Sequence, residues 1–345
     1  MHFNQPSLRV YTKKEIQSIT RVRNLETKIG EKVETLGNFP DGLKKSKAKF
    51  VLLGLPEDIG VRANYGRGGA HTAWKPALEN ILNIQSNQFF SGESLLVLGH
   101  IDFDSLMQQS SHLHSKSEKD IAQMRKMVEL IDKVVFEVVK EIIAADKIPI
   151  VIGGGHNNSY PLIKAAANNN SRKKINVLNC DPHTDFRSQE GRHSGNGFSY
   201  AYHEGFLNKY SVFGIHESYN TRDVLFQFQT QSKKLNYSTF EEMFIAQSIA
   251  FEDALKASIE FCKSKPCGLE IDLDAITNVP TSAKTSSGLS PIQARQFVYQ
   301  SAKLLKPIYF HIAEGSPILA HIKADNKTGK LIAYLVADFI KAVSN

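Results

Sequence analysis

The spacing of apolar residues differs between the first fifty residues of this chain and the rest. From Ile16 to Leu36, apolar positions recur at three- and four-residue steps, and Thr12–Glu15 before them has the form of a helix capping box. The pattern predicts one amphipathic helix from Thr12 to about Leu36. Its apolar stripe is typical of packing against the body of the protein or against another subunit, and its basic face is then solvated.

From Lys49 onward, short aliphatic or β-branched runs alternate with longer helical patterns. The runs that we predict to be strands are Phe50–Leu53, Ser94–Leu98, Ile148–Ile152, Ile175–Asn179, Tyr210–Phe213, Lys234–Leu235 with its neighbours, Gly268–Asp272 and Ile308–His311. The clearest helical pattern covers Ser117–Ala145. Strands that alternate with helices form a parallel sheet covered on both sides. We therefore expect one α/β domain over residues 50–345, preceded by a basic extension over residues 1–49.

The basic charge of the chain belongs mainly to that extension. The 345 residues include 42 Lys+Arg and 35 Asp+Glu, which gives a formal net charge of +7. Residues 1–50 alone contain eleven basic and five acidic side chains, so the remainder is close to neutral. A surface that binds a polyanion would spread its basic residues differently. We therefore expect no nucleic acid and no membrane among the partners.

Composition and cysteine content favour a globular cytoplasmic protein. Hydrophobic residues make up 41% of the chain and charged residues 22%, which excludes disordered, collagen-like and disulfide-scaffold classes. The start of the chain has no secretory signal pattern, and no apolar run approaches the roughly 18 residues of a membrane span. The three cysteines, Cys180, Cys262 and Cys267, have no zinc-like spacing, so we expect reduced thiols.

Polar side chains that can bind metal follow three of the predicted strands. A glycine turn after Ile152 presents His156, and the strand that ends at Asn179 runs into a D-x-H-x-D sequence at Asp181–Asp185. In extended chain, the two carboxylates and the imidazole of that sequence share one face. The strand at residues 268–271 ends in Asp272–Asp274, again with two carboxylates on one face. Ligands bind beyond the carboxyl ends of parallel strands, where these groups converge.

The predicted metal ligands are two imidazoles and four carboxylates: His156, Asp181, His183, Asp185, Asp272 and Asp274. One ion does not need six such side chains, so two ions that share carboxylates, about 3.5–4 Å apart, are the economical interpretation. Oxygen-rich ligation with imidazole and no thiolate favours Mn²⁺ over structural Zn²⁺. A water between the two ions would lose a proton near neutral pH and become a hydroxide nucleophile.

These blocks resemble the ureohydrolase family of arginases, agmatinases and formimidoylglutamases. The family's GG-x-H, D-x-H-x-D and D-x-D blocks correspond in the same order to Gly153–His156, Asp181–Asp185 and Asp272–Asp274, and Gly54–Ala70 is similar to its first loop. The resemblance covers roughly residues 50–345, a ureohydrolase catalytic domain. It implies a three-layer α/β/α sandwich with an eight-stranded, mostly parallel sheet, two Mn²⁺ ions per chain and a homo-oligomer. The implied reaction is hydrolysis of a guanidino or amidino carbon.

The resemblance also implies roles for individual residues. Asp185 would orient the hydroxide, and Glu314 matches the acidic residue that pairs with the cationic amidine of the substrate. The sequence Ser194–Phe198 resembles the substrate loop, so Ser194 and Asn196 are expected substrate contacts. Without the family, Glu314 would read as an ordinary exposed glutamate.

Three departures from the arginase pattern distinguish among substrates. Phe198 stands where arginases place a histidine used in proton transfer, Arg187 replaces an asparagine, and Gly155 replaces an aspartate. All three resemble formimidoylglutamases. The fork of Arg187 suits a carboxylate, and a glutamate moiety has two carboxylates to place. We therefore expect cleavage of N-formimidoyl-L-glutamate to L-glutamate and formamide, with His193 and His203 as candidates for proton transfer.

Other readings remain open at the level of sequence. An arginase or agmatinase would act on a guanidine, although agmatine would leave Arg187 without an anion. A single-metal, deacetylase-like site is a further enzyme class. A basic polyanion-binding protein with a non-catalytic metal site would use the first fifty residues.

Overall fold

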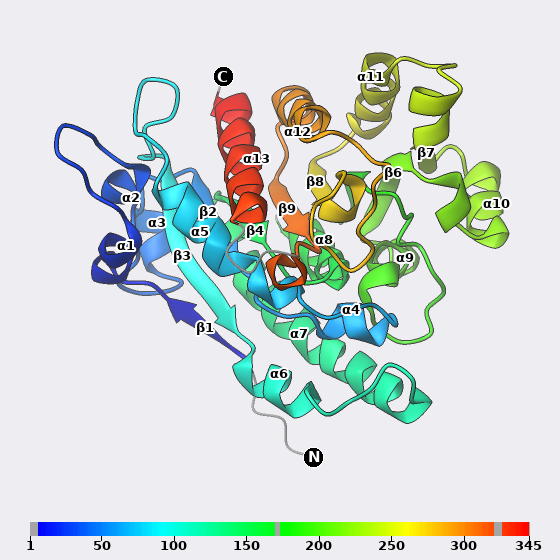
Figure 1. Cartoon of the computed structure of the whole chain (residues 1–345), viewed down its shortest axis with the longest axis horizontal. Helices are drawn as coiled ribbons and strands as arrows, with labels where there is room; N and C mark the ends of the chain where they lie inside the picture. Colours follow the sequence, from blue (N-terminus) through cyan, green and yellow to red (C-terminus); the bar gives the residue numbers. More distant parts are fainter. Residues whose placement is uncertain (1–5, 170–172, 321–325, 345) are drawn as a thin grey trace.

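A computed structural model of the chain describes residues 6–169, 173–320 and 326–344. Its described strands form one sheet in the order β1-β3-β2-β4-β9-β8-β5-β6-β7 (Figure 1). The strands are β1 (Ser7–Val10), β2 (Phe50–Gly54), β3 (Leu95–Asp102), β4 (Ile148–Ile152), β5 (Ile175–Cys180), β6 (Leu207–Ile215), β7 (Leu235–Thr239), β8 (Cys267–Asp272) and β9 (Tyr309–Ala313). All neighbouring pairs from β3 to β7 are parallel.

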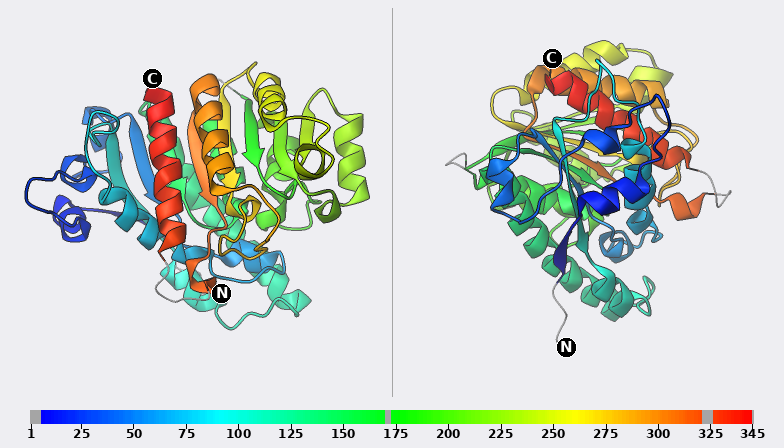
Figure 2. Two further views of the ribbon diagram at one scale, coloured as in Figure 1. Left: turned by 45° about the horizontal axis from the view of Figure 1, so that its top comes forward. Right: turned by 90° about the vertical axis from the view of Figure 1, so that its left-hand side faces the viewer.

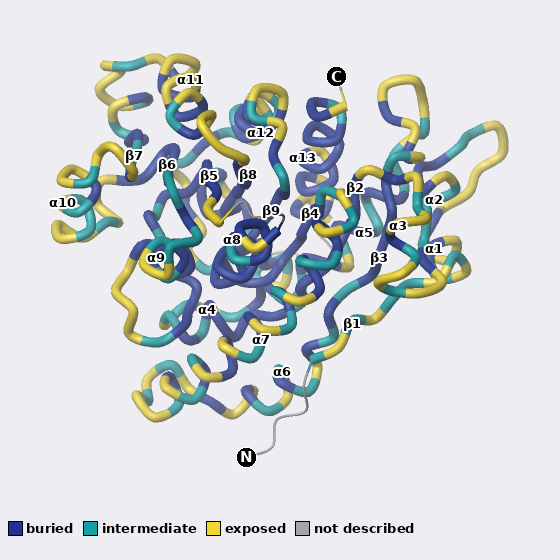
Figure 3. Tube along the Cα trace, turned by 180° about the vertical axis from the view of Figure 1, so that it is seen from behind, coloured by how far each residue is buried: buried dark blue, intermediate teal, exposed yellow. Residues whose placement is uncertain are grey.

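The predicted α/β class and all of the predicted strands are confirmed. Residues of β2, β5, β8 and β9 are buried along their whole length, as near-continuous apolar runs in a two-sided parallel sheet require (Figure 3). The expected eight strands become nine because β1 pairs antiparallel with β3, from Ser7 opposite Asp102 to Val10 opposite Gly99. This edge strand has only four residues, which alternate between exposed and partly buried, and such a pattern is too short to recognise in the sequence.

Helices cover both faces of the sheet (Figure 2). One face carries α5 (Trp74–Leu82), α11 (Phe251–Cys262), α12 (Pro291–Leu305) and α13 (Lys327–Ser344), and the other carries α4 (Ile59–Ala63), α6 (Asp104–Ser110), α7 (Glu118–Ala144), α8 (Ser159–Ala167), α9 (Gly197–His203) and α10 (Arg222–Thr230). Alternate residues of β2 enter the two cores: Phe50 and Leu52 join the first, and Val51 and Leu53 the second. The long helix predicted at residues 117–145 is confirmed as α7, with Ser117 as its N-cap.

The single helix predicted from Thr12 to Leu36 is wrong. The capping box is present, but α1 covers only Lys13–Ile19, and separate short helices follow as α2 (Ile29–Lys32) and α3 (Gly42–Lys45). Backbone groups at the start of α2 and just after it bond to the body of the protein instead. Ile29 N–H donates to Ile84 O, and Glu34 N–H donates to Leu95 O. Tertiary hydrogen bonds therefore outweigh the local helical pattern.

The apolar stripe of this segment nevertheless packs as expected on the body of the protein. Ile16, Ile29 and Val33 are buried in the core cluster that contains α5, whereas Val22 and Leu25 in the interrupted part are exposed. The described part of residues 1–49 thus shares its core with the sheet. No helix in the described ranges combines the length and the hydropathy that a membrane span requires.

Candidate metal centre

The three predicted ligand blocks meet at one edge of the sheet. They follow β4, β5 and β8, and Glu314 follows β9, so the contributing strands are adjacent in the order β4-β9-β8-β5. Because these strands are parallel, their carboxyl ends lie at the same edge. The segments are spread over residues 156 to 314 of the sequence, and the sheet brings them together.

His156 lies at the centre of a group of carboxylates. Its Nδ1 is 3.1 Å from Asp181 Oδ2, 3.0 Å from Asp185 Oδ2 and 3.2 Å from Asp272 Oδ2. The ring is fully buried. It begins a short 3₁₀ helix, η2 (His156–Asn158), behind a turn in which Gly154 has a φ of +73°. A Cβ at Gly154 would collide with the Asn158 side chain, so the turn needs glycine there.

His183 lies beside the same carboxylates but is more open. Its Nδ1 is 3.4 Å from Asp181 Oδ1 and 4.0 Å from Asp274 Oδ2, and 31% of its side-chain surface is exposed. Asp181 therefore presents one oxygen to His156 and the other to His183. A carboxylate in this position can bridge two cations.

The unpaired polar atoms of this group fit bound cations. Although it touches three carboxylates, His156 Nδ1 makes no hydrogen bond of acceptable geometry, and Asp274 Oδ1 also has no partner among the described residues. Buried carboxylates without compensating charge are costly. His156, Asp181, Asp185 and Asp272 offer ligand atoms within 4.8 Å of one another, the reach of one ion. Asp181 and Asp274 with His183 would hold a second.

Protonation of the two histidines reflects the same excess of negative charge. Burial lowers the pKa of His183, but its hydrogen bond with Asp181 and the charge of that carboxylate raise it to about 10. Burial likewise opposes protonation of His156, and the carboxylates of Asp181, Asp185 and Asp272 raise its pKa well above the usual value. Protons on these rings take the place that a cation would fill.

Glu270 supports His156 from behind, a contact that the sequence analysis missed. Its Oε2 lies 3.4 Å from His156 Nε2 and 2.6 Å from His311 Nδ1, and its Oε1 accepts a hydrogen bond from the Tyr309 hydroxyl at 2.8 Å. Glu270 on β8 and His311 on β9 are direct register partners. His156 Nε2 makes no hydrogen bond of acceptable geometry with this carboxylate, but the negative charge 3.4 Å away favours the tautomer that carries its proton on Nε2 and leaves Nδ1 for the ion. Its sequence signal was the two-residue step from Glu270 to Asp272, which places both on one face of the strand.

Glu57 was also missed, and it holds the turn that presents His156. This buried carboxylate accepts hydrogen bonds from Gly155 N–H at 3.0 Å, from Asn158 Nδ2 at 2.8 Å and from Ile59 N–H at 2.8 Å. Burial raises the pKa of Glu57, while the Gly155 and Asn158 bonds oppose that shift. Its only sequence signal was its position in Gly54–Ala70, the stretch that resembles the first loop of the family.

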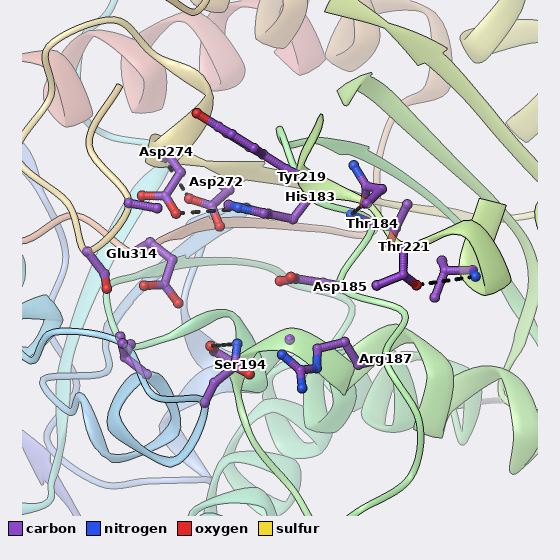
Figure 4. Close-up of a pocket in the computed structure, with 18 of the residues that line it drawn as sticks. His183, Thr184, Asp185, Arg187, Ser194, Tyr219, Thr221, Asp272, Asp274 and Glu314 are labelled. Carbon is purple, nitrogen blue, oxygen red and sulfur yellow. Dashed lines mark hydrogen bonds and ion pairs between the residues drawn. The ribbon is translucent and has the colours of Figure 1, made fainter. Parts of the chain in front are cut away.

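A cavity of about 570 Å³ opens over the centre. Its wall includes Asn64, His183, Asp185, Arg187, Ser194, Tyr219, Thr221, Asp223, Asp272, Asp274 and Glu314. Glu314 is buried, with a φ of +66°, and its Oε1 accepts a hydrogen bond from His156 N–H at 2.8 Å. Burial raises its pKa well above the usual value. Half of the Arg187 side chain is exposed. Its guanidinium and the buried Glu314 carboxylate both line this cavity (Figure 4).

The structure places Asn196 inside its own loop. Its side chain is fully buried and does not line the cavity. Its Oδ1 accepts hydrogen bonds from Arg192 Nη1 at 2.6 Å and from His193 N–H at 3.1 Å, and its Nδ2 donates to Ser188 O at 3.2 Å and Gly191 O at 2.8 Å. The bonding capacity of Asn196 is thus used inside the loop that presents Ser194 to the cavity.

Neither histidine suggested for proton transfer lines the cavity. His193 is buried, its Nδ1 accepts a hydrogen bond from Gly195 N–H at 3.1 Å, and burial with the nearby arginines lowers its pKa to about 3. His203 packs on Phe186. Phe198 fills the space behind the centre, with its ring edge-on to His156 at 5.1 Å. The position that holds a histidine in arginases therefore offers an apolar contact.

Comparison with known proteins places the chain in a family. The profile of the Arginase family matches residues 48–341. The chain belongs to the arginase family. It is 26% identical over 298 residues to formimidoylglutamase of Streptococcus gordonii, covering 83% of this chain and 82% of that protein. It is 27% identical over 307 residues to formimidoylglutamase of Staphylococcus aureus, covering 86% of this chain and 88% of that protein.

Solved structures share the arginase-family fold. Trypanosoma cruzi formiminoglutamase, solved with Mn²⁺, aligns with a TM-score of 0.68 at 19% identity over 93% of this chain and 99% of that chain. Formimidoylglutamase of Bacillus subtilis aligns with a TM-score of 0.70 at 18% identity over 94% of both chains. A hypothetical agmatinase of Burkholderia thailandensis gives 0.67 at 17% identity over 86% of both chains. At these identities the likeness confirms the fold.

Proposed function

We propose that this chain is a binuclear manganese hydrolase that converts N-formimidoyl-L-glutamate and water to L-glutamate and formamide. As an arginase-family protein with formimidoylglutamase relatives, it is a hydrolase of carbon–nitrogen bonds in linear amidines. The observation that carries the choice of substrate is the position of Arg187 in the wall of the cavity that Glu314 and the ligand carboxylates border. The names of the relatives and the replacement at Phe198 support the same choice.

The metal-ligating residues fit two Mn²⁺ ions, one held by His156, Asp181, Asp185 and Asp272 and the other by His183, Asp181 and Asp274. When bound, such ions supply a nucleophile at neutral pH by lowering the pKa of a water. Asp185 borders the cavity and contacts His156, so its carboxylate is placed to orient that nucleophile.

The remaining side chains place the substrate. Glu314 offers a buried negative charge to the cationic amidine, and its hydrogen bond from His156 N–H holds it in place. Arg187 and the Ser194 hydroxyl, in the same wall, are placed to bind carboxylates. Attack on the amidine carbon gives a tetrahedral intermediate, and protonation of the leaving amine releases glutamate.

Asp223 provides a specific reason to test a guanidine substrate as the second candidate. It lines the cavity together with Arg187 and is exposed. An α-amino acid such as arginine would place its carboxylate on Arg187 and its ammonium group near Asp223, and its hydrolysis would release urea. A second carboxylate of formimidoyl-glutamate would be repelled by Asp223 unless it binds elsewhere in the wall.

Family membership supports two further parts of the proposal. We propose that the chain assembles as a homo-oligomer and acts in the cytoplasm, with a small amidine as its partner and no nucleic acid or membrane. The pairing of the N-terminal strand with β3 places the basic segment along one edge of the sheet. An assembly or docking role for residues 1–49 is part of this proposal.

A panel of substrates tests the proposal. The Mn²⁺-loaded chain is assayed with formimidoyl-glutamate, arginine, agmatine and guanidinobutyrate, and formamide and urea are measured. We expect formamide from formimidoyl-glutamate at the highest kcat/KM. Faster release of urea from arginine would favour the second candidate, and no activity on any of the four would contradict the proposed function.

The variant Arg187→Ala tests recognition of the carboxylates. We expect KM for formimidoyl-glutamate to rise about 10- to 100-fold with a smaller change in kcat, because a charge-assisted hydrogen bond is lost. Hydrolysis of agmatine, which has no carboxylate, should not change in KM. Arg187→Lys serves as the matched control, since it keeps the charge and loses the fork. An unchanged KM in Arg187→Ala would show that Arg187 does not take part in substrate recognition.

A further inference from the structure

The turn after β6 is tied by hydrogen bonds to the backbone on both sides of His183. This turn, η4 (Glu217–Tyr219), is followed by Asn220, whose side chain bonds to residues on both sides of the histidine. Asn220 Oδ1 accepts a hydrogen bond from Thr184 N–H at 2.8 Å, and its Nδ2 donates to Pro182 O at 3.2 Å. The loops after β5 and β6 are therefore tied together at the metal centre.

Tyr219 in the same turn covers one face of the His183 ring. The two rings are stacked, with centroids 5.4 Å apart and an interplanar angle of 19° (Figure 4). Tyr219 also stacks on His216 at 5.0 Å and 17°, and His216 stacks on Phe240 at 4.7 Å and 11°. This aromatic stack runs from the body of the protein to the metal ligand, so the position of Tyr219 is fixed independently of the ion.

His183 lacks the support that His156 has. Among the described residues, no carboxylate or carbonyl is paired with His183 Nε2, whereas Glu270 lies behind His156 Nε2. The His183 side chain is 31% exposed, and Tyr219 is itself 46% exposed in the cavity wall. A partly exposed imidazole can rotate about its side-chain bonds, and rotation would turn Nδ1 away from Asp181 and Asp274.

We propose that Tyr219 is a positioning residue that sets the affinity of the ion bound by His183. The inference rests on the proposed binuclear site, since it concerns how one ligand of that site is held. Stacking restricts the imidazole to the orientation in which Nδ1 faces the carboxylates, and this lowers the cost of ordering the ring when the ion binds. The tyrosine hydroxyl plays no part in this role, so the aromatic face alone is required.

The test is a Mn²⁺ titration of the metal-free, full-length chain by calorimetry, with Tyr219→Ala and Tyr219→Phe compared with the wild type. We expect two ions in all three proteins. In Tyr219→Ala one site should weaken roughly tenfold, the scale of a stacked ring pair, while the other is unchanged. Tyr219→Phe keeps the ring and should match the wild type. The absorption spectrum of the Co²⁺-loaded variants gives a second readout, because a displaced imidazole changes the ligand field.

The outcomes separate this inference from the function on which it rests. If the wild type binds two ions and Tyr219→Ala binds both with wild-type affinity, the role of Tyr219 is overturned. If Tyr219→Phe weakens binding as much as Tyr219→Ala, the aromatic face is not the cause, which also overturns it. If the wild type takes up one ion only, the binuclear function fails. The affinity of that one ion in Tyr219→Ala and Tyr219→Phe then tests the role of Tyr219. Circular dichroism of Tyr219→Ala serves to check that the variant is folded before its metal affinity is compared.

Discussion

The two histidines of the candidate metal centre are held in different ways. His156 is fully buried, with three carboxylate oxygens 3.0–3.2 Å from Nδ1 and Glu270 behind Nε2. His183 is partly exposed, lies 3.4 Å from its nearest carboxylate oxygen, and is covered by the ring of Tyr219. Buried carboxylates therefore surround His156, whereas an aromatic ring in the cavity wall covers His183.

The difference follows from the position of the strands. His156 follows β4 and is supported from β8 and β9, whose side chains at the centre of the sheet are inaccessible to water. His183 follows β5, and its loop forms part of the cavity wall beside β6. Removing one partner of a buried ion pair is strongly destabilising, because the other charge stays buried without compensation. A stacked pair of rings at the surface contributes less free energy, and its contribution depends on the contact area. The two halves should therefore respond differently to substitution.

The largest effect is expected from Asp181→Asn, because Asp181 contacts both histidines. An amide supplies no negative charge to either ion, so both should be lost and kcat/KM should fall by at least about a thousandfold. Metal content per chain, measured by elemental analysis after dialysis, checks this prediction. The exposed cavity residue Asp223 supplies a control, and Asp223→Asn should retain both ions. Retention of two ions by Asp181→Asn would show that the Asp181 carboxylate is required by neither ion.

An intermediate effect is expected from Glu270→Gln, which acts on the His156 half alone. The amide keeps the size of the side chain but removes the charge that His311 and His156 face, so affinity for one ion should fall about 10- to 100-fold. Calorimetric titration with Mn²⁺ should show one weakened and one unchanged site. The change should add to that of Tyr219→Ala in the double variant, since the two residues act on different ligands. Weakening of both sites would show that the halves are coupled.

The smallest effect is the change in metal affinity over a single pH unit. The raised pKa of His183, about 10 against an ordinary 6.5, keeps this ring protonated in the metal-free chain at neutral pH. Protonation therefore stabilises the metal-free fold fully below pH 6.5, and this contribution is lost as pH rises through about 10. An ion must displace that proton, so affinity should rise up to tenfold per pH unit between these values. Calorimetry in two buffers of different ionisation enthalpy measures the released protons, and Glu270→Gln should still release the proton of His183.

Much of the fold could be predicted because its strands are buried on both faces. Phe50–Gly54 has no polar side chain, and Ile175–Cys180 is mainly apolar apart from the buried Asn176 and Asn179, a pattern typical of parallel sheets. The strand Ser7–Val10 and the break after Ile19 could not be predicted, because both depend on hydrogen bonds to β3 and to residues 84–86 that lie far away in sequence. Local periodicity contains no information about such partners.

The sequence by itself determined which side chains are candidate metal ligands, since D-x-H-x-D and D-x-D place like groups on one face of an extended chain, and parallel strands bring their ends together. It also identified Arg187, Ser194 and Glu314, which line one cavity. Only the tertiary structure decided that Asn196 is enclosed in its own loop, that Glu270 and Glu57 support His156, and that Tyr219 covers His183. Those roles depend on which side chains face each other across strands and loops, and spacing along the chain does not specify that.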